Sequence, residues 1–384
     1  MLKKKDKKPA RSFGHLLKWL IAIPVTFTLF VGLYIQIMDT ELFHDPEFTR
    51  PLLWILLIFA TACFIRVAIR WRGQLLVRDY LRRFDELENL GTFHVAYPRI
   101  YNPRQKVPHA VLLLHGYTVS PQEFDHLLAH FREAEIPYYA PQITGFGLSS
   151  VNLLYTASAA DWARDAISAY DRLSAFAENI SVIGHSMGCV LATFLAEHRK
   201  VHHLILSGPG FYASPHDAAV TRLLRTPILS HAVQWVIPLL PKPIRRGRLS
   251  YADTIDLDAA ENSFQYIALP IHSVMQVLRA QTIVDIRKAQ FDDLTVLWGK
   301  DDQTVDVPRL LRFLEDNKVP FRSHCFERTG HNCFEDYDRD EAVKVVMEVL
   351  ADLKGMDHAG KRAAEPDRCL PAPEKQSASG GLRP

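Results

Sequence analysis

The stretch Asn179-Ile-Ser-Val-Ile-Gly-His-Ser-Met-Gly-Cys-Val-Leu-Ala-Thr-Phe-Leu-Ala196 decides the fold of this chain. A short apolar run leads into the pentapeptide Gly184-His-Ser-Met-Gly188, and an apolar segment with helical spacing follows it. This pattern predicts a strand, a tight turn and a helix. The turn leaves little room for side chains two residues before and two after Ser186, which accounts for both glycines. We expect it to present the Ser186 hydroxyl and to leave the backbone N–H of Met187 at the start of the helix.

An earlier strand and its turn provide a second part of the same candidate site. The run His109-Ala-Val-Leu-Leu-Leu-His-Gly116 predicts a buried strand that ends in a glycine turn. Ser120, with Pro121 after it and Glu123 three residues on, has the pattern of a capped helix start. We therefore expect the backbone N–H of Tyr117 to be available as a second hydrogen-bond donor. The role we expect for His115 is to orient this loop.

An acid and a histidine follow late in the chain. Asp293–Gly299 predicts a strand, and Asp301 and Asp302 come directly after it. His331 lies in a Gly-containing loop nearer the end. A serine is a weak nucleophile unless a base lies beside it, and a third group usually orients that base. A serine, a histidine and an aspartate fit the roles of nucleophile, base and orienting group. Either Asp301 or Asp302 could be the orienting acid.

The order of the three groups, serine, then acid, then histidine, is that of α/β-hydrolases. Four motifs carry a closer resemblance: Leu112-Leu-Leu-His-Gly116, Gly184-His-Ser-Met-Gly188, Trp298-Gly-Lys-Asp-Asp302 and Gly330-His331. With them, residues 90–354 resemble the α/β-hydrolase superfamily. The branch they resemble most is that of the monoacylglycerol lipases, lysophospholipases and carboxylesterases.

The resemblance implies a role for each matching residue. Ser186 is the expected nucleophile, and His331 the group that takes its proton and returns one to the leaving alcohol. Asp302 is the expected acid, since the family places it third after the glycine that ends its strand. The backbone N–H groups of Tyr117 and Met187 are the expected oxyanion hole. The resemblance implies no cofactor, and the sequence contains no Cys-x-x-Cys motif that would indicate a structural metal.

The N-terminal part of the chain predicts a transmembrane hairpin. Met1–Arg11 is rich in lysine, Trp19–Met38 is uncharged, and Pro51–Ile65 is apolar again. We expect helices at about 16–38 and 51–70. Basic residues flank both outer ends and the connecting loop is acidic, so both ends should be cytoplasmic. In a bacterium this would be the inner membrane. A cleaved signal peptide fits less well because no small-residue cleavage site follows the first run. A buried helix pair is the remaining alternative.

The chain divides into three predicted parts. Residues 1–83 form the membrane segment and residues 84–354 the catalytic domain, with a mainly helical insertion at about 209–290. Residues 355–384 are rich in Pro, Gly and charge, and we expect them to be disordered. The insertion would cover the edge of the sheet where active sites of α/β proteins form. The formal net charge of +2 on 384 residues gives no reason to expect a nucleic-acid partner.

These observations predict a membrane-anchored serine hydrolase of carboxylic esters that works through an acyl-enzyme. The hairpin and the apolar insertion favour a lipid-derived substrate, a monoacylglycerol or a lysophospholipid. The expected partners are the bilayer and a lipid or small ester substrate, and the sequence indicates no oligomeric state. One alternative is a thioesterase or serine aminopeptidase-like acyl hydrolase with the same three residues. The other is a non-catalytic membrane interaction protein.

Overall fold

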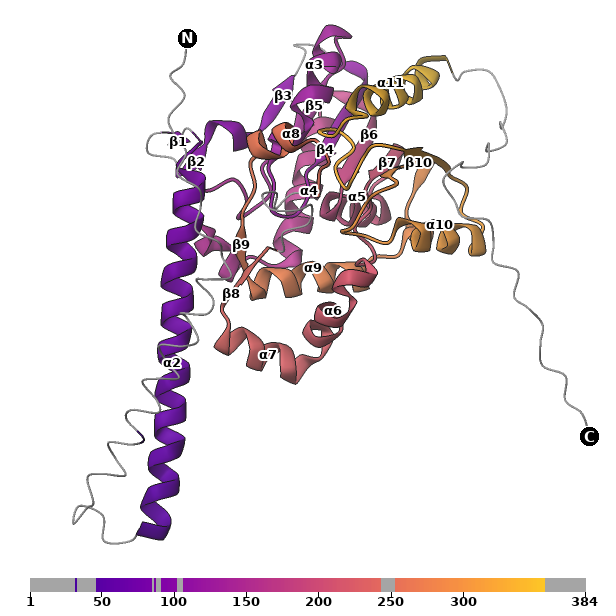
Figure 1. Ribbon diagram of the computed structural model, residues 1–384. Coiled ribbons are helices and arrows are strands. Elements are labelled where there is room, and N and C mark those ends of the chain that lie inside the picture. Colours follow the sequence, from indigo (N-terminus) through magenta and orange to yellow (C-terminus); the bar gives the residue numbers. More distant parts are fainter. Residues whose placement is uncertain are drawn as a thin grey trace, which may run out of the picture.

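A computed structural model describes residues 46–84, 86–87, 91–101, 106–242 and 253–355, together with Gly32. Its centre is a seven-stranded sheet with the order β11-β10-β7-β6-β4-β5-β3 (Figure 1). All neighbouring strands are parallel except β3, which pairs with β5 in the antiparallel sense. The strands are β3 (Arg99–Tyr101), β4 (Val107–Leu114), β5 (Tyr138–Ala140), β6 (Ala177–His185), β7 (Val201–Ser207), β10 (Phe291–Gly299) and β11 (Arg322–Phe326).

Helices cover both faces of the sheet. On β4, Leu112 and Leu114 belong to one buried cluster while Val111 and Leu113 belong to the other, because alternate residues of a strand face opposite ways. The first cluster packs against α4 (Ala159–Ser174), α5 (Met187–His198) and α10 (Val307–Asp316). The second packs against α3 (Asp125–Glu133) and α11 (Arg339–Gly355). The predicted α/β architecture is confirmed.

Between β7 and β10 the chain forms a cap of short elements. In order these are η4 (Pro215–Asp217), α6 (Ala218–Arg225), α7 (Pro227–Val236), β8 (Leu239–Pro241), α8 (Leu257–Asn262), β9 (Ala268–Pro270), α9 (Ile271–Ile283) and η5 (Ile286–Lys288). The segment is mainly helical, as expected. The pairing of β8 with β9 in an antiparallel two-stranded sheet was not predicted, since each strand is only three residues long and contains proline.

Short elements join the larger ones at the N-terminal side of the domain. They are β1 (Glu86–Leu87), β2 (Thr92–Phe93), η1 (His94–Ala96), η2 (Pro121–Phe124) and η3 (Val151–Tyr155). β1 and β2 pair in the antiparallel sense. Ser120 is the N-cap of η2 and Pro121 its first residue, as the sequence predicts.

One long helix, α2 (Pro46–Leu81), precedes the domain. It runs beyond the predicted end near residue 70, because Arg66 and Arg70 mark the end of the apolar run but cations do not end a helix. Its last turns join the hydrophobic core of the domain through Val77 and Leu81, which are buried. In Figure 1 the rest of α2 extends away from the domain.

α2 is long and apolar enough to cross a membrane, and it is the one such helix among the described residues. None of its most apolar window is buried in the protein. The first predicted helix, 16–38, lies outside the described residues except for Gly32, beside which the ring of Trp54 lies. Of the C-terminal segment predicted to be disordered, everything after Gly355 is likewise outside the described residues.

Candidate active site

Ser186 lies in the turn between β6 and α5, with φ +52° and ψ −114°. A positive φ is strained for serine, at a cost of about 1–3 kcal/mol, and such strain is common where a side chain must be presented for chemistry. The two glycines make the turn possible. A Cβ on Gly188 would lie 1.8 Å from the backbone oxygen of Leu114, and one on Gly184 would lie 2.5 Å from that of Gly188.

Three side chains that are distant in sequence form a hydrogen-bonded relay at this turn. The Nε2 of His331 lies 2.8 Å from the Oγ of Ser186, and its Nδ1 lies 2.8 Å from the Oδ2 of Asp302. An ionised carboxylate can only accept, so Nδ1 carries the imidazole proton and Nε2 is left to accept from the serine hydroxyl. The other oxygen of Asp302 accepts the backbone N–H groups of Thr304 and Val305.

The electrostatics of the pair favour an ionised aspartate beside a basic imidazole. Burial raises the pKa of Asp302, but His331 and the hydrogen bonds to the carboxylate outweigh this effect, so the pKa is lowered overall. Burial lowers the pKa of His331, but the Asp302 charge outweighs it, so the pKa is raised overall. The neighbouring Asp301 is exposed, and the carboxylate that hydrogen-bonds His331 is that of Asp302.

A cavity of about 190 Å³ lies over the relay. Ser186, His331, Tyr117 and Met187 line it together. Met187 is the first residue of α5, where a backbone N–H has no acceptor within the helix. Tyr117 follows Gly116, at which a Cβ would lie 3.3 Å from the Cβ of Ser186. Both residues whose N–H groups were predicted as donors therefore line the cavity beside the serine.

The cap supplies the other wall of this cavity. From it come Ala213, Lys242, Asp253, Val277 and Gln281. The backbone oxygen of Asp253 accepts the N–H of His331 at 2.7 Å, and its carboxylate accepts from the backbone N–H of Gln303 and the hydroxyl of Thr304. Sequence reasoning did not find Asp253, because it lies in the insertion and belongs to no motif.

A buried acid–histidine pair lies beneath the relay. The Oε2 of Glu123 is 2.7 Å from the Nδ1 of His185, and its Oε1 accepts the backbone N–H of Gly116 at 2.8 Å. The Nε2 of His185 lies 3.3 Å from the backbone oxygen of His331. The sequence suggested a helix-capping role for Glu123, but its carboxylate joins the Gly116 turn to the serine turn instead. The sequence analysis did not find His185, because it occupies a position of the Gly-x-Ser-x-Gly motif that any residue may fill.

His115 has the orienting role that we expected. Its Nε2 accepts the backbone N–H of Ile143 at 3.1 Å, so Nδ1 carries the proton and donates to the backbone oxygen of Gly116. Burial lowers the pKa of His115, which favours this neutral form. The side chain thus fixes the loop that carries Tyr117.

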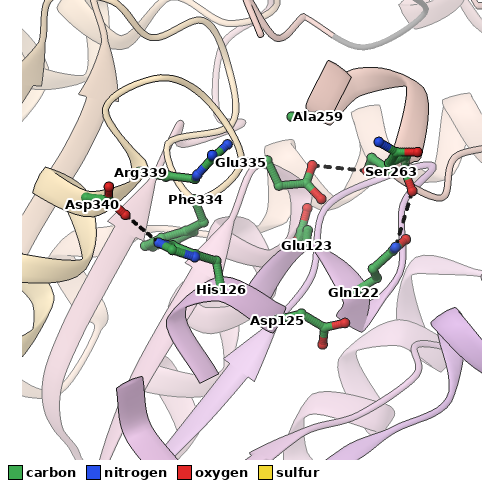
Figure 2. Close-up of a pocket in the computed structure, with 11 residues that line it drawn as sticks. Gln122, Glu123, Asp125, His126, Ala259, Ser263, Phe334, Glu335, Arg339 and Asp340 are labelled. Carbon is green, nitrogen blue, oxygen red and sulfur yellow. Dashed lines mark hydrogen bonds and ion pairs between the residues drawn. The ribbon is translucent and has the colours of Figure 1, made fainter. Parts of the chain in front are cut away.

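Figure 2 shows a second carboxylate, Glu335, directed toward the region of Glu123. The side chains of Ser263 and Asn332 donate to its Oε2 at 3.0 and 2.9 Å. Burial, helped by the Glu123 charge, raises the pKa of Glu335 to about 7. Glu123, Ser263 and Glu335 border a pocket of about 430 Å³ outside the relay. Within the part of the chain that the structure describes, no group of three or more His, Cys, Asp and Glu side chains is arranged to hold a metal ion.

The sequence from residue 111 to residue 345 matches the Alpha/beta hydrolase family. The chain belongs to the α/β-hydrolase family. The matched stretch contains Ser186, Asp302 and His331. No curated protein matches the chain in sequence.

Solved structures of lipolytic enzymes have the same fold. A structure from work on the metagenome-derived lipolytic enzymes LipS and LipT is 17% identical, with a TM-score of 0.56, 68% of this chain covered and 99% of the other. Monoacylglycerol lipase from Paleococcus ferrophilus is 20% identical, with a TM-score of 0.51 and coverages of 66% and 99%. A soluble variant of monoglyceride lipase from Saccharomyces cerevisiae, in complex with a substrate analog, is 14% identical, with a TM-score of 0.54 and coverages of 70% and 94%. At these sequence identities, the similarity to the three structures shows only that this chain shares their fold.

Proposed function

We propose that this α/β-hydrolase cleaves carboxylic esters, with Ser186 as the nucleophile. The observation that carries the proposal is the relay in which His331 lies 2.8 Å from both the Ser186 hydroxyl and the Asp302 carboxylate. Nucleophile, base and orienting acid are the three parts of a serine hydrolase site. The relay borders a cavity that Tyr117 and Met187 also line, which supports their backbone N–H groups as the donors that receive a carbonyl oxygen.

The first half of the reaction transfers the acyl group to the enzyme. His331 Nε2 takes the hydroxyl proton while Ser186 Oγ bonds to the ester carbonyl carbon, and the carbonyl oxygen becomes an oxyanion. The N–H groups of Tyr117 and Met187 stabilise this charge, and losing one such donor costs about 3–4 kcal/mol of barrier. The oxyanion then collapses, the bond to the alcohol oxygen breaks, and the proton on Nε2 goes to the departing alcohol.

The second half returns the enzyme to its starting state. Water attacks the acyl carbon, and His331 Nε2 takes a proton from it. The tetrahedral intermediate collapses, the bond to Ser186 Oγ breaks, and Nε2 returns the proton to that oxygen. Asp302 keeps His331 in the required tautomer throughout and stabilises the imidazolium that forms in each half.

We further propose that the substrate is a lipid-derived ester, a monoacylglycerol or a lysophospholipid. The support is the two apolar side chains, Val277 and Ala213, that the cap contributes to the cavity beside Lys242, Asp253 and Gln281, and the fold shared with two monoacylglycerol lipases. A cavity of about 190 Å³ is below the ~300 Å³ typical of ligand pockets, so a long acyl chain must extend along the cap or separate its helices.

Membrane anchoring through the N-terminal segment is part of the proposal. It rests on the length and apolar character of α2, on the lysines of Met1–Arg11 and on the uncharged run Trp19–Met38. Two spans with cytoplasmic ends would keep the catalytic domain, residues 84–354, at the cytoplasmic face of the membrane. A reporter fused after Arg83 should score as cytoplasmic, and an extracytoplasmic result would contradict this orientation.

The activity is tested with the purified full-length protein on a panel of esters, acyl thioesters and aminoacyl amides. We expect turnover of monoacylglycerol and lysophospholipid, and Ser186→Ala should lower kcat by at least about 10⁴-fold. Ser174→Ala, at an exposed serine that ends α4, is the matched control and should be unchanged. Thioester or amide turnover without ester turnover would contradict the ester proposal while keeping the nucleophile.

A further inference from the structure

The cap carries an exposed apolar surface that the catalytic site does not use. It lies on α6, α7 and the residue after α7, and includes Val220, Leu223, Ile228, Leu229, Trp235 and Ile237. Ile228 is 84% exposed, which is extreme for isoleucine in a folded domain. Contiguous apolar patches of this kind mark interaction sites. We call these six residues the apolar cap surface.

The apolar cap surface is continuous with the exposed apolar part of α2. The ring of Trp235 stacks on that of Phe59, with centroids 5.5 Å apart. On α2, the residues that remain exposed include Trp54, Ile55, Ile58, Phe59, Phe64 and Val67. Figure 1 shows α7 beside the middle of α2, at the edge of the domain from which the helix extends.

Specific contacts fix α7 against α2. The guanidinium of Arg66 donates to the backbone oxygens of Gln234 and Trp235, in the last turn of α7. Farther along α2, a Cβ on Gly73 would come 2.0 Å from the Cδ2 of Leu239 in β8. A larger residue at position 73 would therefore require the Leu239 side chain to move. The cap cannot turn away from α2 without losing both contacts.

These contacts set the depth of α7 along α2. Phe59 and Arg66 are about two helical turns apart, or about 10 Å. The contacts of α7 span this interval, and Arg66 is the first charged residue at the domain-side end of the apolar run. If the apolar part of α2 lies in a bilayer, α7 lies at the depth of the headgroups and the first acyl carbons, where interfacial helices bind.

The charges around the apolar cap surface fit an anionic membrane. Residues 218–242 contain no aspartate or glutamate. Arg222 and Arg225 are exposed on α6. A surface that combines exposed apolar side chains with cations and lacks acids is attracted to anionic headgroups.

The inner side of the same helices reaches the active site. Leu224 of α6 packs on Ile271 and Leu278 of α9, and Val277 and Gln281 of α9 line the cavity that contains Ser186. A single layer of helix therefore separates the apolar cap surface from the proposed nucleophile.

We infer that the apolar cap surface binds the bilayer beside α2, so that the cap is a second, interfacial membrane element that contacts acyl lipid in the leaflet. The inference rests on the proposed membrane anchoring through α2 and deepens the proposed function, because it makes the leaflet the source of the substrate. The occupant of the surface is a lipid bilayer that contains anionic headgroups.

The test is photo-crosslinking of the full-length protein in phosphatidylcholine vesicles that contain phosphatidylglycerol. Benzoylphenylalanine replaces Ile228 in one variant and Ile100 in another, and mass spectrometry identifies the adducts. Ile100 is the matched control, since it is an exposed isoleucine on β3, away from α2. A third variant carries the probe at Ile58 of α2 and reports on anchoring alone. We expect lipid adducts at residues 228 and 58 and none at residue 100.

Other outcomes have distinct meanings. A lipid adduct at residue 58 without one at residue 228 overturns the inference and leaves the anchoring intact. No lipid adduct at either residue overturns both. A protein adduct at residue 228 means that a second copy or another protein covers the surface, which also overturns the inference. Ester turnover in solution is measured separately, so failure of the catalytic proposal is recognised independently.

A double variant of the apolar cap surface extends the test to activity. Ile228→Glu with Leu229→Glu adds two charges to the apolar cap surface and changes no residue that lines the cavity. Turnover of a soluble short-chain ester should stay within about twofold, while turnover of vesicle-bound monoacylglycerol should fall at least about tenfold. An equal effect on both substrates, or no effect on either, would contradict membrane binding by the cap. The matched control, Ile100→Glu, should change neither rate.

Discussion

The carboxylate of Glu123 lies 2.7 Å from the Nδ1 of His185, in a pair that is almost wholly buried beneath Ser186. Its other oxygen binds the backbone N–H of Gly116, directly before the residue that we propose as an oxyanion donor. The Nε2 of His185 approaches the backbone oxygen of His331. The buried Glu123–His185 pair thus joins three loops that carry the proposed machinery. Glu123 acts as a positioning residue, directly for the Gly116 and serine turns and through His185 for the His331 loop.

Glu123→Ala should impair both stability and catalysis. It leaves the Gly116 N–H and the His185 imidazole without their buried acceptor, so the free energy of unfolding should fall by roughly 3 kcal/mol. The displaced loops should lower kcat more than they raise KM. Urea unfolding and steady-state kinetics measure the two effects. Glu133→Ala, at an exposed glutamate of α3, should leave both unchanged. Wild-type stability in Glu123→Ala would refute the positioning role.

Asp302→Asn should lower kcat by about 10³–10⁴-fold, because asparagine no longer selects the tautomer in which Nε2 of His331 accepts a proton. Asp301→Asn is the matched control at the adjacent exposed residue and should stay within about threefold of the wild-type rate. Steady-state hydrolysis of a p-nitrophenyl ester measures both. If Asp301→Asn proved the more damaging change, the assignment of the acid would be wrong.

The pH dependence of kcat/KM should report the titration of His331. Only the neutral imidazole can accept the Ser186 proton, so activity should fall as the pH drops through the pKa of His331. That pKa is raised above its usual 6.5 by Asp302, so the acid limb should lie above pH 6.5. In Asp302→Asn the residual activity should show this limb at lower pH, since the stabilising charge is gone. An acid limb that does not move in the variant would mean that another group controls it.

Glu335 should make the protein less stable as the pH rises. Its pKa is 4.5 in the unfolded reference and about 7 in the fold, so the folded state binds more protons between these values. Stability therefore falls with increasing pH across this window. Glu335→Gln mimics the protonated form and can still accept from Ser263, so it should reduce the fall in Tm between about pH 5 and 8. Glu341→Gln, at an exposed glutamate of α11, should leave the fall unchanged. A fall that persists fully in Glu335→Gln would contradict the role of Glu335.

The fold was readable from sequence wherever a local pattern had a single structural solution. The apolar run before Gly184 predicted a buried strand and the glycines around Ser186 a tight turn, and β6 and α5 lie where they were expected. His331 was expected from its place in a late glycine-containing loop. Residue type left Asp301 and Asp302 both open, and the family resemblance chose Asp302 because it places the acid third after the strand-end glycine. The short distances between Ser186, Asp302 and His331 depend on which strands are neighbours in the sheet. No single segment of the sequence encodes that order.

The parts that were missed depend on tertiary contacts. α2 was expected to end near Arg70, but its last turns are stabilised by the domain around Val77 and Leu81. Glu123 had a sufficient local explanation as a capping residue, and only the fold brings it beside His185. Asp253 and Gly73 have no motif at all. Their roles come from the close approach of segments that are far apart in the chain.

The central claim, that Ser186 is the nucleophile of a hydrolase site, is tested most directly by trapping it. The full-length protein is incubated with a fluorophosphonate, digested and mapped by mass spectrometry. We predict a single covalent adduct on Ser186, absent in Ser186→Ala and strongly slowed when His331→Ala removes the base. An adduct on another serine, or labelling that persists in Ser186→Ala, would contradict the account.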